Sequence, residues 1–244
     1  MRSAPEAAPA VSGWLRGRLL VDRLLAVVLA ALTAPVVAVL AVLIRRQDGH
    51  AALIRVPRVG RGGRVFGMWK LRSMRVETAD GRAGGASLTS SADDRITPLG
   101  RKLRALHADE LPQLYNVALG QMCLLGPRPE APDFVDHDAL WAEVLAAPPG
   151  IAGPTQLIVG DWERTQIDVD SDGSAYREVV VPVKAAIDRW YVQRATPRTD
   201  LLVLTSLARH LAGRDFPALR RAVRAAVPEA LAPLRHLETT SEAA

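Results

Sequence analysis

An adjacent pair of acidic residues, Asp109 and Glu110, is the part of the sequence best suited to chemistry. Two neighbouring carboxylates repel each other, so they need positive charge nearby. Four basic residues are close enough in the sequence to supply some of it: Arg101, Lys102, Arg104 and Arg128. A carboxylate pair in such a cationic setting suits magnesium and phosphate chemistry.

A purely structural role for the acidic pair is the alternative. Thr97 followed by Pro98 predicts a helix start with a hydroxyl N-cap. A second helix is expected to begin at Asp109 and to end near Gly120, which would make Asp109 an N-cap and Glu110 a first-turn acid. The two roles are compatible, because a helix N-terminus favours a carboxylate and also attracts phosphate.

Two short strands are predicted before the acidic pair, at residues 51–59 and 64–74, and residues 60–63 form the turn between them. The Gly-, Ala- and Ser-rich segment 77–92 that follows is predicted to be a surface loop. The strands carry basic residues that could face a shared site: Arg58, Lys70 and Arg72. A solvated cationic strand would explain these residues equally well when they are considered alone.

A membrane segment is predicted at residues 24–44, which contain no charged residue. As a helix this run would be about 31 Å long at about 1.5 Å per residue, enough to cross a bilayer. Pro35 lies in its middle, where it removes a backbone hydrogen bond to the Ala31 carbonyl and kinks the helix. The Thr33 hydroxyl could bond a carbonyl freed in this way.

Arginine flanks this segment on both sides. The flanking residues are Arg16, Arg18 and Arg23 before it and Arg45 and Arg46 after it. Equal flanks favour a re-entrant helix-break-helix, which enters and leaves the membrane by the cytoplasmic face, over a single-pass helix. A cleaved signal peptide and a buried helix of a soluble protein are further alternatives, and the first is disfavoured because the apolar run exceeds a usual signal core.

The composition restricts the function classes. The net charge is +5 and most basic residues are arginine, which favours phosphates, an anionic membrane surface or nucleic acid as partners. Aromatic residues make up only 5% of the chain, which leaves little for stacking on nucleic-acid bases. Cys123 is the single cysteine, so an intrachain disulfide and a thiolate metal cluster are excluded, and a buried position in a reducing compartment is expected.

The motifs resemble, in order and spacing, those of the bacterial polyprenyl-phosphate phosphoglycosyl transferases, the initiating sugar transferases of capsule, exopolysaccharide and O-antigen assembly. The resemblance covers about residues 18–211. The matching segments are Arg58-Val59-Gly60, Lys70-Leu71-Arg72-Ser73-Met74, Arg95-Ile96-Thr97, Gly100, Leu103-Arg104, Asp109-Glu110-Leu111-Pro112-Gln113-Leu114, Asn116-Val117, Gly126-Pro127-Arg128-Pro129, Pro149-Gly150-Ile151, Gly153, Gln156, Lys184, Asp188 and Tyr191. The chain departs from the family pattern at Ala34, His107, Ala108, Gln121, Cys123, Ala152, Pro154 and Thr155.

The resemblance implies an α+β fold: a small membrane-associated domain with an N-terminal re-entrant helix, a short β-hairpin and several amphipathic interfacial helices. The implied organisation is a disordered N-terminus at residues 1–15, the membrane helix at 16–46, a cytoplasmic catalytic domain at 47–212, and a helical extension with a frayed tail at 213–244.

The resemblance also implies an activity: transfer of a sugar-1-phosphate from a nucleotide sugar, expected to be UDP-linked, to polyprenyl phosphate, with release of UMP. Asp109 is implied to be the nucleophile, which would form a phosphosugar-aspartyl intermediate. Asp109 and Glu110 are the implied ligands of Mg²⁺. The implied phosphate-binding residues are Lys70, Arg104 and Arg128, with Arg58, Arg72 and, for the nucleotide-sugar pocket, Gln156 as weaker candidates.

The implied partners are the nucleotide-sugar donor, the polyprenyl (undecaprenyl) phosphate acceptor and the bacterial inner membrane, with the catalytic domain on its cytoplasmic face. Nucleic acid is not expected as a partner, and a homodimer is one allowed assembly. A catalytically silent, membrane-anchored basic scaffold that binds anionic lipid or assembly enzymes is the alternative function.

Overall fold

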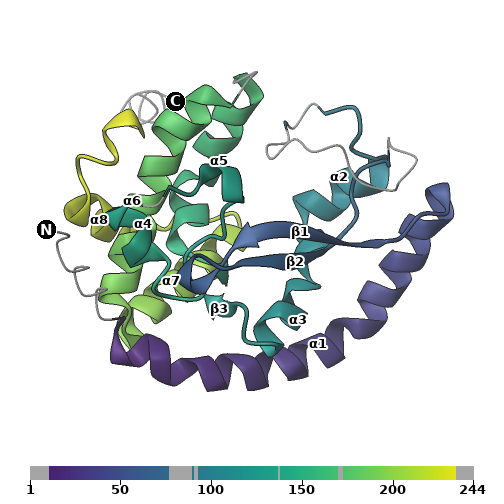
Figure 1. The fold of residues 1–244 in the computed structure, drawn as a ribbon, viewed down its shortest axis with the longest axis horizontal. Helices are drawn as coiled ribbons and strands as arrows, with labels where there is room; N and C mark the ends of the chain where they lie inside the picture. The colour runs from purple at the N-terminus through teal and green to yellow at the C-terminus, as the bar shows by residue number, and fades with distance from the viewer. Residues whose placement is uncertain (1–10, 77–89, 91–92, 137, 170–172, 235–244) are drawn as a thin grey trace, which may run out of the picture.

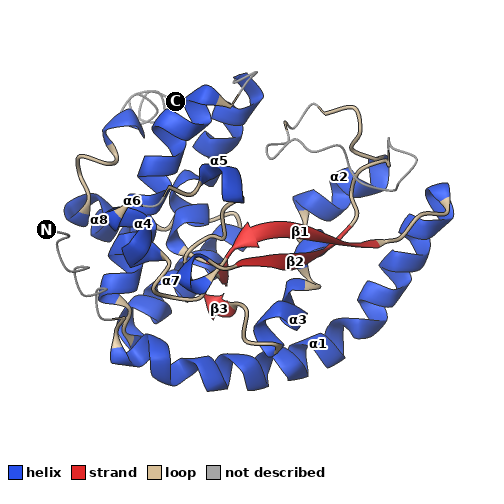
Figure 2. Cartoon of the chain, in the orientation of Figure 1, coloured by secondary structure: helices blue, strands red, loops and turns tan. Residues whose placement is uncertain are grey.

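The computed structural model describes residues 11–76, 90, 93–136, 138–169 and 173–234. Almost all of the predicted loop at 77–92, most of the N-terminal segment 1–15 and the end of the C-terminal tail lie outside these described residues. The described part is a mostly helical α+β structure with a long N-terminal helix, a β-hairpin and a pair of short parallel strands (Figures 1 and 2).

The helices and strands follow one another along the chain in a mixed order. They are α1 (Gly13–Asp48), β1 (Leu53–Val59), β2 (Val65–Leu71), α2 (Pro98–Ala105), α3 (Gln113–Ala118), β3 (Cys123–Leu125), α4 (Ala139–Val144), β4 (Gly150–Ala152), α5 (Pro154–Val169), α6 (Val181–Arg194), α7 (Pro197–Leu211) and α8 (Pro217–Ala226).

The predicted hairpin is confirmed. Strands β1 and β2 pair antiparallel, from Leu53 with Leu71 to Val59 with Val65. Side chains alternate between the two faces of a strand, and directly paired residues share a face. Arg58 pairs with Phe66, and Lys70, four residues after Phe66, pairs with Ile54. Because four is an even number of residues, Arg58 and Lys70 lie on the same face of the hairpin.

The parallel pair β3–β4 joins the segment before Arg128 to the segment before α5. Three glycines make this close approach possible. A Cβ on Gly150 would lie 2.1 Å from the Gly126 nitrogen, and one on Gly153 would lie 2.2 Å from the Gly126 oxygen, so no side chain fits at either position. The backbone that leads into Arg128 is therefore held closely against the start of α5.

Helix α1 is continuous from Gly13 to Asp48, so the expected break at Pro35 is wrong. The helix instead bows around the rest of the chain, with the hairpin and α3 on its concave side (Figure 1). The Thr33 hydroxyl bonds the carbonyl of Leu29 at 2.8 Å rather than the freed carbonyl of Ala31, because a hydroxyl in a helix reaches the carbonyl one turn before it. The helix thus continues through Pro35 without interruption.

One narrow stripe of α1 is buried against the rest of the protein. Its members are spaced three, four or seven residues apart: Leu15, Arg18, Asp22, Ala26, Ala30, Val37 and Ile44. The remaining faces expose large apolar side chains, among them Leu24, Val28, Leu32, Val36 and Val39. Among the described helices, α1 alone is long and apolar enough to cross a membrane.

Both ends of α1 are tied to the same domain. Near the N-terminal end, the Arg18 guanidinium donates to the Tyr191 hydroxyl at 3.1 Å and forms a buried ion pair with Asp200. At the C-terminal end, Arg72 donates to Asp48 at 2.6 Å. The helix is therefore anchored near both of its ends rather than at one point.

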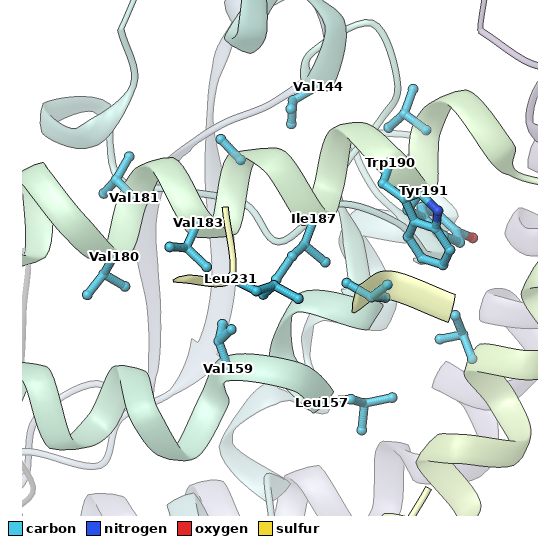
Figure 3. Close-up of a cluster of buried hydrophobic side chains, with 14 of the residues drawn as sticks. Val144, Leu157, Val159, Val180, Val181, Val183, Ile187, Trp190, Tyr191 and Leu231 are labelled. Carbon is cyan, nitrogen blue, oxygen red and sulfur yellow. The ribbon is translucent and has the colours of Figure 1, made fainter. Parts of the chain in front are cut away.

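The main hydrophobic core lies among the helices of the C-terminal half. Val183, Ile187 and Tyr191 of α6 cluster with Val144 of α4 and Val159 of α5 (Figure 3). A second, smaller cluster packs the hairpin and α3 against α1, and its members are Ala26, Ala30, Met68, Leu114, Val117 and Met122. These two clusters fix the hairpin and the segment 126–130 relative to each other.

Candidate active site

The acidic pair and two cations form one contiguous cluster. Lys70 at the end of β2 places its Nζ 2.9 Å from Glu110 Oε1 and 3.8 Å from Asp109 Oδ2. The Arg128 guanidinium donates to both oxygens of Glu110, at 3.0 and 3.4 Å. Three segments far apart in the sequence thus meet at one carboxylate pair.

The local backbone explains how the pair is presented. Asp109 and Glu110 lie in a 3-10 turn at Ala108–Glu110, so the expected helix start at Asp109 is wrong, and α3 begins only at Gln113. His107 precedes the turn with a φ of 53°, which is the left-handed region that non-glycine residues rarely adopt. This sharp turn directs Asp109 inward, where only 6% of the residue is exposed.

The predicted helix start at Thr97 and Pro98, before the turn, is confirmed. The Thr97 hydroxyl accepts a hydrogen bond from the Gly100 N–H at 2.9 Å, which confirms the N-cap of α2. A Cβ on Gly100 would lie 1.9 Å from the Ser73 carbonyl oxygen. Glycine at this position therefore lets α2 lie directly on the chain that leaves the hairpin.

The two carboxylates differ in electrostatic environment. Burial raises the pKa of Asp109, and the charge of Lys70 only partly offsets this effect. Burial alone would also raise the pKa of Glu110, but Arg128 and Lys70 outweigh it and hold that pKa well below its usual range. Glu110 is therefore firmly ionised, whereas Asp109 is a buried carboxylate that retains its basicity.

Two further predicted cations lie near this cluster. Burial lowers the pKa of Arg58, and the charge of Glu130 partly offsets this effect. The N–H of the next residue, Val59, donates to the Glu130 carbonyl at 2.9 Å, which places this end of the strand beside Glu130. The Arg58 guanidinium bonds only the Pro57 carbonyl, at 3.0 Å, and has no ion-pair partner within the described residues. Arg104 on α2 is close enough to Asp109 for its positive charge to lower the pKa of that carboxyl.

Two weaker candidates are placed differently. The guanidinium of Arg72 is engaged by Asp48 and by the Ala51 carbonyl at 2.8 Å, and no hydrogen bond in the described part of the chain joins Arg72 to the acidic pair. Gln156 lies in the first turn of α5, where its Nε2 donates to the Ile151 carbonyl at 3.2 Å. Its Oε1 is buried and has no hydrogen-bond donor among the described residues.

A buried ionic network behind Arg128 was not assigned by sequence reasoning. Lys184 of α6 forms ion pairs with Glu130 and, at 2.6 Å, with Glu163 of α5, and it donates to the Tyr176 hydroxyl at 2.7 Å. The resemblance had marked Lys184 without a role, and Glu130, Glu163 and Tyr176 carried no signal of their own. Pairs of this kind hold several elements together around a buried charge.

Asn116 was matched in the sequence without a role, and its contacts now explain it. Its Oδ1 accepts from the Trp69 N–H at 2.9 Å, and its Nδ2 donates to the Gly67 carbonyl at 2.9 Å. Asn116 therefore pins α3 to β2. Because Lys70 follows Trp69 directly, this contact also fixes the lysine relative to the acidic pair.

The donor set fits a magnesium ion that is completed by substrate. Within the described residues, no group of three or more His, Cys, Asp or Glu side chains could hold a metal. Mg²⁺ commonly binds one or two carboxylates together with substrate phosphates and water, rather than a cage made only of protein. Asp109 and Glu110 supply oxygen ligands of this type.

Comparison with known proteins gives the family. Residues 15–213 match the family model described as bacterial sugar transferase. A UDP-N-acetylgalactosamine-undecaprenyl-phosphate N-acetylgalactosaminephosphotransferase of Aeromonas hydrophila is 35% identical over 160 residues, covering 62% of this chain and 37% of that protein. A UDP-glucose:undecaprenyl-phosphate glucose-1-phosphate transferase of Caulobacter vibrioides is 39% identical over 155 residues, covering 61% of this chain and 56% of that protein.

A putative undecaprenyl-phosphate N-acetylgalactosaminyl 1-phosphate transferase of Bacillus subtilis is 41% identical over 106 residues, covering 43% of this chain and 58% of that protein. The alignments thus cover between about a third and three-fifths of these relatives. The family match, by contrast, extends over most of the chain and includes the hairpin, the acidic pair and Arg128. The chain therefore belongs to the bacterial sugar transferase family.

Proposed function

We propose that this protein transfers a sugar-1-phosphate from a UDP-sugar to undecaprenyl phosphate in the bacterial inner membrane and releases UMP. The observation that carries the proposal is the Asp109–Glu110 pair, which forms ion pairs with Lys70 and Arg128 in a domain that also has the long apolar helix α1. The donor and acceptor classes are those named for the relatives from Aeromonas and Caulobacter.

In the first step, an Asp109 carboxylate oxygen attacks the sugar-bearing phosphorus of the donor. A phosphorus–oxygen bond to the aspartate forms, the bond to the bridging oxygen breaks, and UMP leaves with that oxygen and its electron pair. The buried setting that raises the pKa of Asp109 strips water from the carboxylate and preserves its nucleophilicity. Glu110, held ionised by two cations, keeps those cations in place.

In the second step, a phosphate oxygen of the lipid attacks the same phosphorus. The bond to Asp109 breaks, the carboxylate is restored, and the product is a polyprenyl diphosphate sugar. The covalent relay splits one transfer between two polyanions into two steps, each of which brings fewer negative charges together. Arg128, Lys70 and Arg58 would neutralise charge on the phosphoryl oxygens, with Arg104 beside Asp109.

Magnesium is the cofactor that we assign to the site. Asp109 and Glu110 would hold it. When bound, the ion would neutralise pyrophosphate charge and so reduce its repulsion from the carboxylates. Glu110 already accepts from Lys70 and Arg128, so its oxygens would be shared between the ion and these cations.

The docking of α1 at both ends supports a re-entrant, one-sided membrane topology. Arg18 is bound near one end and Asp48 at the other end by residues of the same domain. A straight spanning helix would place its two ends on opposite sides of the bilayer, whereas here both ends contact the same domain. We therefore assign both ends of α1 and the catalytic domain to the cytoplasmic face, with the exposed apolar faces of α1 in the lipid.

The test is release of UMP by the purified full-length chain with undecaprenyl phosphate. UDP-N-acetylgalactosamine, UDP-glucose and UDP-galactose are the donors to compare, each with Mg²⁺ and with EDTA. We expect Mg²⁺-dependent UMP release with at least one donor. Binding of anionic lipid without release from any donor would favour the alternative of a silent basic scaffold, although a scaffold has no evident use for a buried carboxylate such as Asp109.

A further inference from the structure

Behind Arg128 lies a buried carboxylate that the reaction scheme above does not use. Asp188 of α6 is only 3% exposed. Its Oδ2 accepts a hydrogen bond from the backbone N–H of Arg128 at 3.1 Å, and its Oδ1 accepts one from the Thr155 hydroxyl at 2.5 Å. Both oxygens are therefore occupied, one by the site segment and one by the first turn of α5.

The same segment is fixed on its other side by backbone hydrogen bonds. The Gly126 N–H donates to the Ala152 carbonyl at 2.9 Å, and the Gly150 N–H donates to the Pro127 carbonyl at 2.8 Å. Arg128 comes next, and its N–H is the one that Asp188 accepts. Three consecutive residues thus have their backbone held at the point where the Arg128 side chain extends toward Glu110.

A contribution to folding stability alone does not account for an aspartate at position 188. Burying a carboxylate costs free energy, and an apolar side chain of similar size would commonly give equal or greater stability. The cost is visible here, because burial raises the pKa of Asp188 to about 7 even though Thr155 and the Arg128 amide favour the ionised form. What the carboxylate supplies is an acceptor for one particular backbone N–H.

We propose that Asp188, oriented by the Thr155 hydroxyl, is a positioning residue that holds the Arg128 backbone so that its guanidinium serves the reacting phosphate. The expected effect of Asp188 on catalysis rests on the proposed sugar-phosphate transfer. The hydrogen bond between Asp188 and the Arg128 N–H does not depend on that proposal.

The first arm of the test measures the contact without any substrate. Prolines have no backbone N–H, so in Pro127–Pro129 the amide of Arg128 is the only one available for hydrogen exchange. Thr155→Val keeps the shape but removes the donor to Asp188, whereas Thr155→Ser keeps the donor. We expect the Arg128 amide to exchange faster in Thr155→Val and to stay protected in Thr155→Ser and in the control Thr165→Val, which alters an exposed hydroxyl of the same helix.

The second arm measures the consequence for catalysis with the UDP-sugar that the parent protein turns over. Loss of a hydrogen bond to a charged group should lower kcat about 10-fold in Thr155→Val, with KM little changed and activity restored in Thr155→Ser. In an Arg128→Ala background, Thr155→Val should have no further effect, because its influence passes through Arg128. Thermal melts of all variants check that each protein is folded.

Faster exchange together with a non-additive loss of kcat supports the proposal. Unchanged protection of the Arg128 amide in Thr155→Val overturns it, whether or not the protein is active. So does faster exchange with unaltered kcat, or a loss that simply adds to that of Arg128→Ala. A parent protein that releases no UMP from any donor would refute the proposed function, while hydrogen exchange would still decide whether Asp188 holds Arg128.

Discussion

Asp109 and Glu110 are neighbours in the chain, yet their surroundings shift their pKa values in opposite directions. Burial raises the pKa of Asp109, whereas Arg128 and Lys70 hold that of Glu110 low despite its burial. A pair of carboxylates separated in this way can divide two tasks between them. The more basic Asp109 is suited to attack phosphorus, and the firmly ionised Glu110 is suited to hold cations.

Removing the charge of Arg128 or of Lys70 should reduce turnover far more than it reduces the stability of the fold. For Arg128→Ala and Lys70→Ala we expect kcat/KM to fall about 10²-fold or more, because each removes a charge that we assign to the reacting phosphate. Arg128→Lys should keep partial activity, since it retains the charge but loses the two-pronged contact with Glu110. Arg221→Ala, which alters an exposed arginine of α8, is the matched control. Parent-like rates in all three site variants would place the phosphates elsewhere.

Arg72 should behave differently from Arg128 although both are arginines of matched motifs. Its contacts with Asp48 and the Ala51 carbonyl fasten the end of α1, so Arg72→Ala should lower the free energy of unfolding by about 1–3 kcal/mol. Thermal or chemical unfolding in detergent would measure this. The KM for the UDP-sugar, measured on the folded fraction, should stay close to that of the parent. A large rise in KM without loss of stability would return Arg72 to the substrate pocket.

The pH dependence of stability should report on Asp188. Its pKa is raised by burial to about 7 in the folded protein, so between its unfolded value and pH 7 the folded state binds more protons and stability falls as pH rises. Asp188→Asn cannot ionise and escapes this loss. The difference in melting temperature between Asp188→Asn and the parent should therefore become more positive from pH 4 to pH 8. A difference that stays constant or falls over this range would contradict a buried, raised-pKa carboxylate.

The one-sided topology makes a prediction that labelling can test. A Cβ on Gly13 meets no atom within 4 Å, so Gly13→Cys in a Cys123→Ser background gives an open reporter at the start of α1. A membrane-impermeant thiol reagent applied to intact cells should fail to label it. Adding Pro35→Leu favours a straighter helix of membrane-spanning length, so labelling should then appear.

Arg221→Cys in the same background, on α8 of the C-terminal extension, is the control for the expected cytoplasmic side and should stay unlabelled throughout. Labelling of Gly13→Cys when Pro35 is present would indicate an ordinary single-pass anchor. The assignment of both helix ends to the cytoplasmic face would then have to be abandoned.

Features determined by neighbouring residues were predictable from the sequence. The hairpin followed from two apolar strands around a Gly-rich turn, and the start of α2 followed from Thr97 and Pro98. The acidic pair was identifiable because two carboxylates in a cationic segment are unusual. Its meeting with Lys70 was expected only from the resemblance, since 40 residues separate Lys70 from Glu110.

Features determined by distant contacts were not predictable. Arg18 appeared to be a membrane-flanking charge, but it is buried against Asp200, which lies 182 residues further along the chain. The bowed course of α1 depends on that contact and on Asp48 with Arg72. Asp109 was expected to cap a helix, but the left-handed backbone at His107 turns the chain before α3 begins. No local pattern encodes such contacts.

The most direct test of the central claim is isolation of the covalent intermediate. The full-length chain is incubated with Mg²⁺ and the UDP-sugar that it turns over, without any polyprenyl phosphate, and is then analysed by intact-protein and peptide mass spectrometry. Our account predicts a mass increase equal to one sugar phosphate on the peptide that contains Asp109, loss of this adduct when undecaprenyl phosphate is added, and no adduct in Asp109→Asn. An Asp109→Asn protein that still transfers sugar phosphate at a rate near that of the parent would contradict the account.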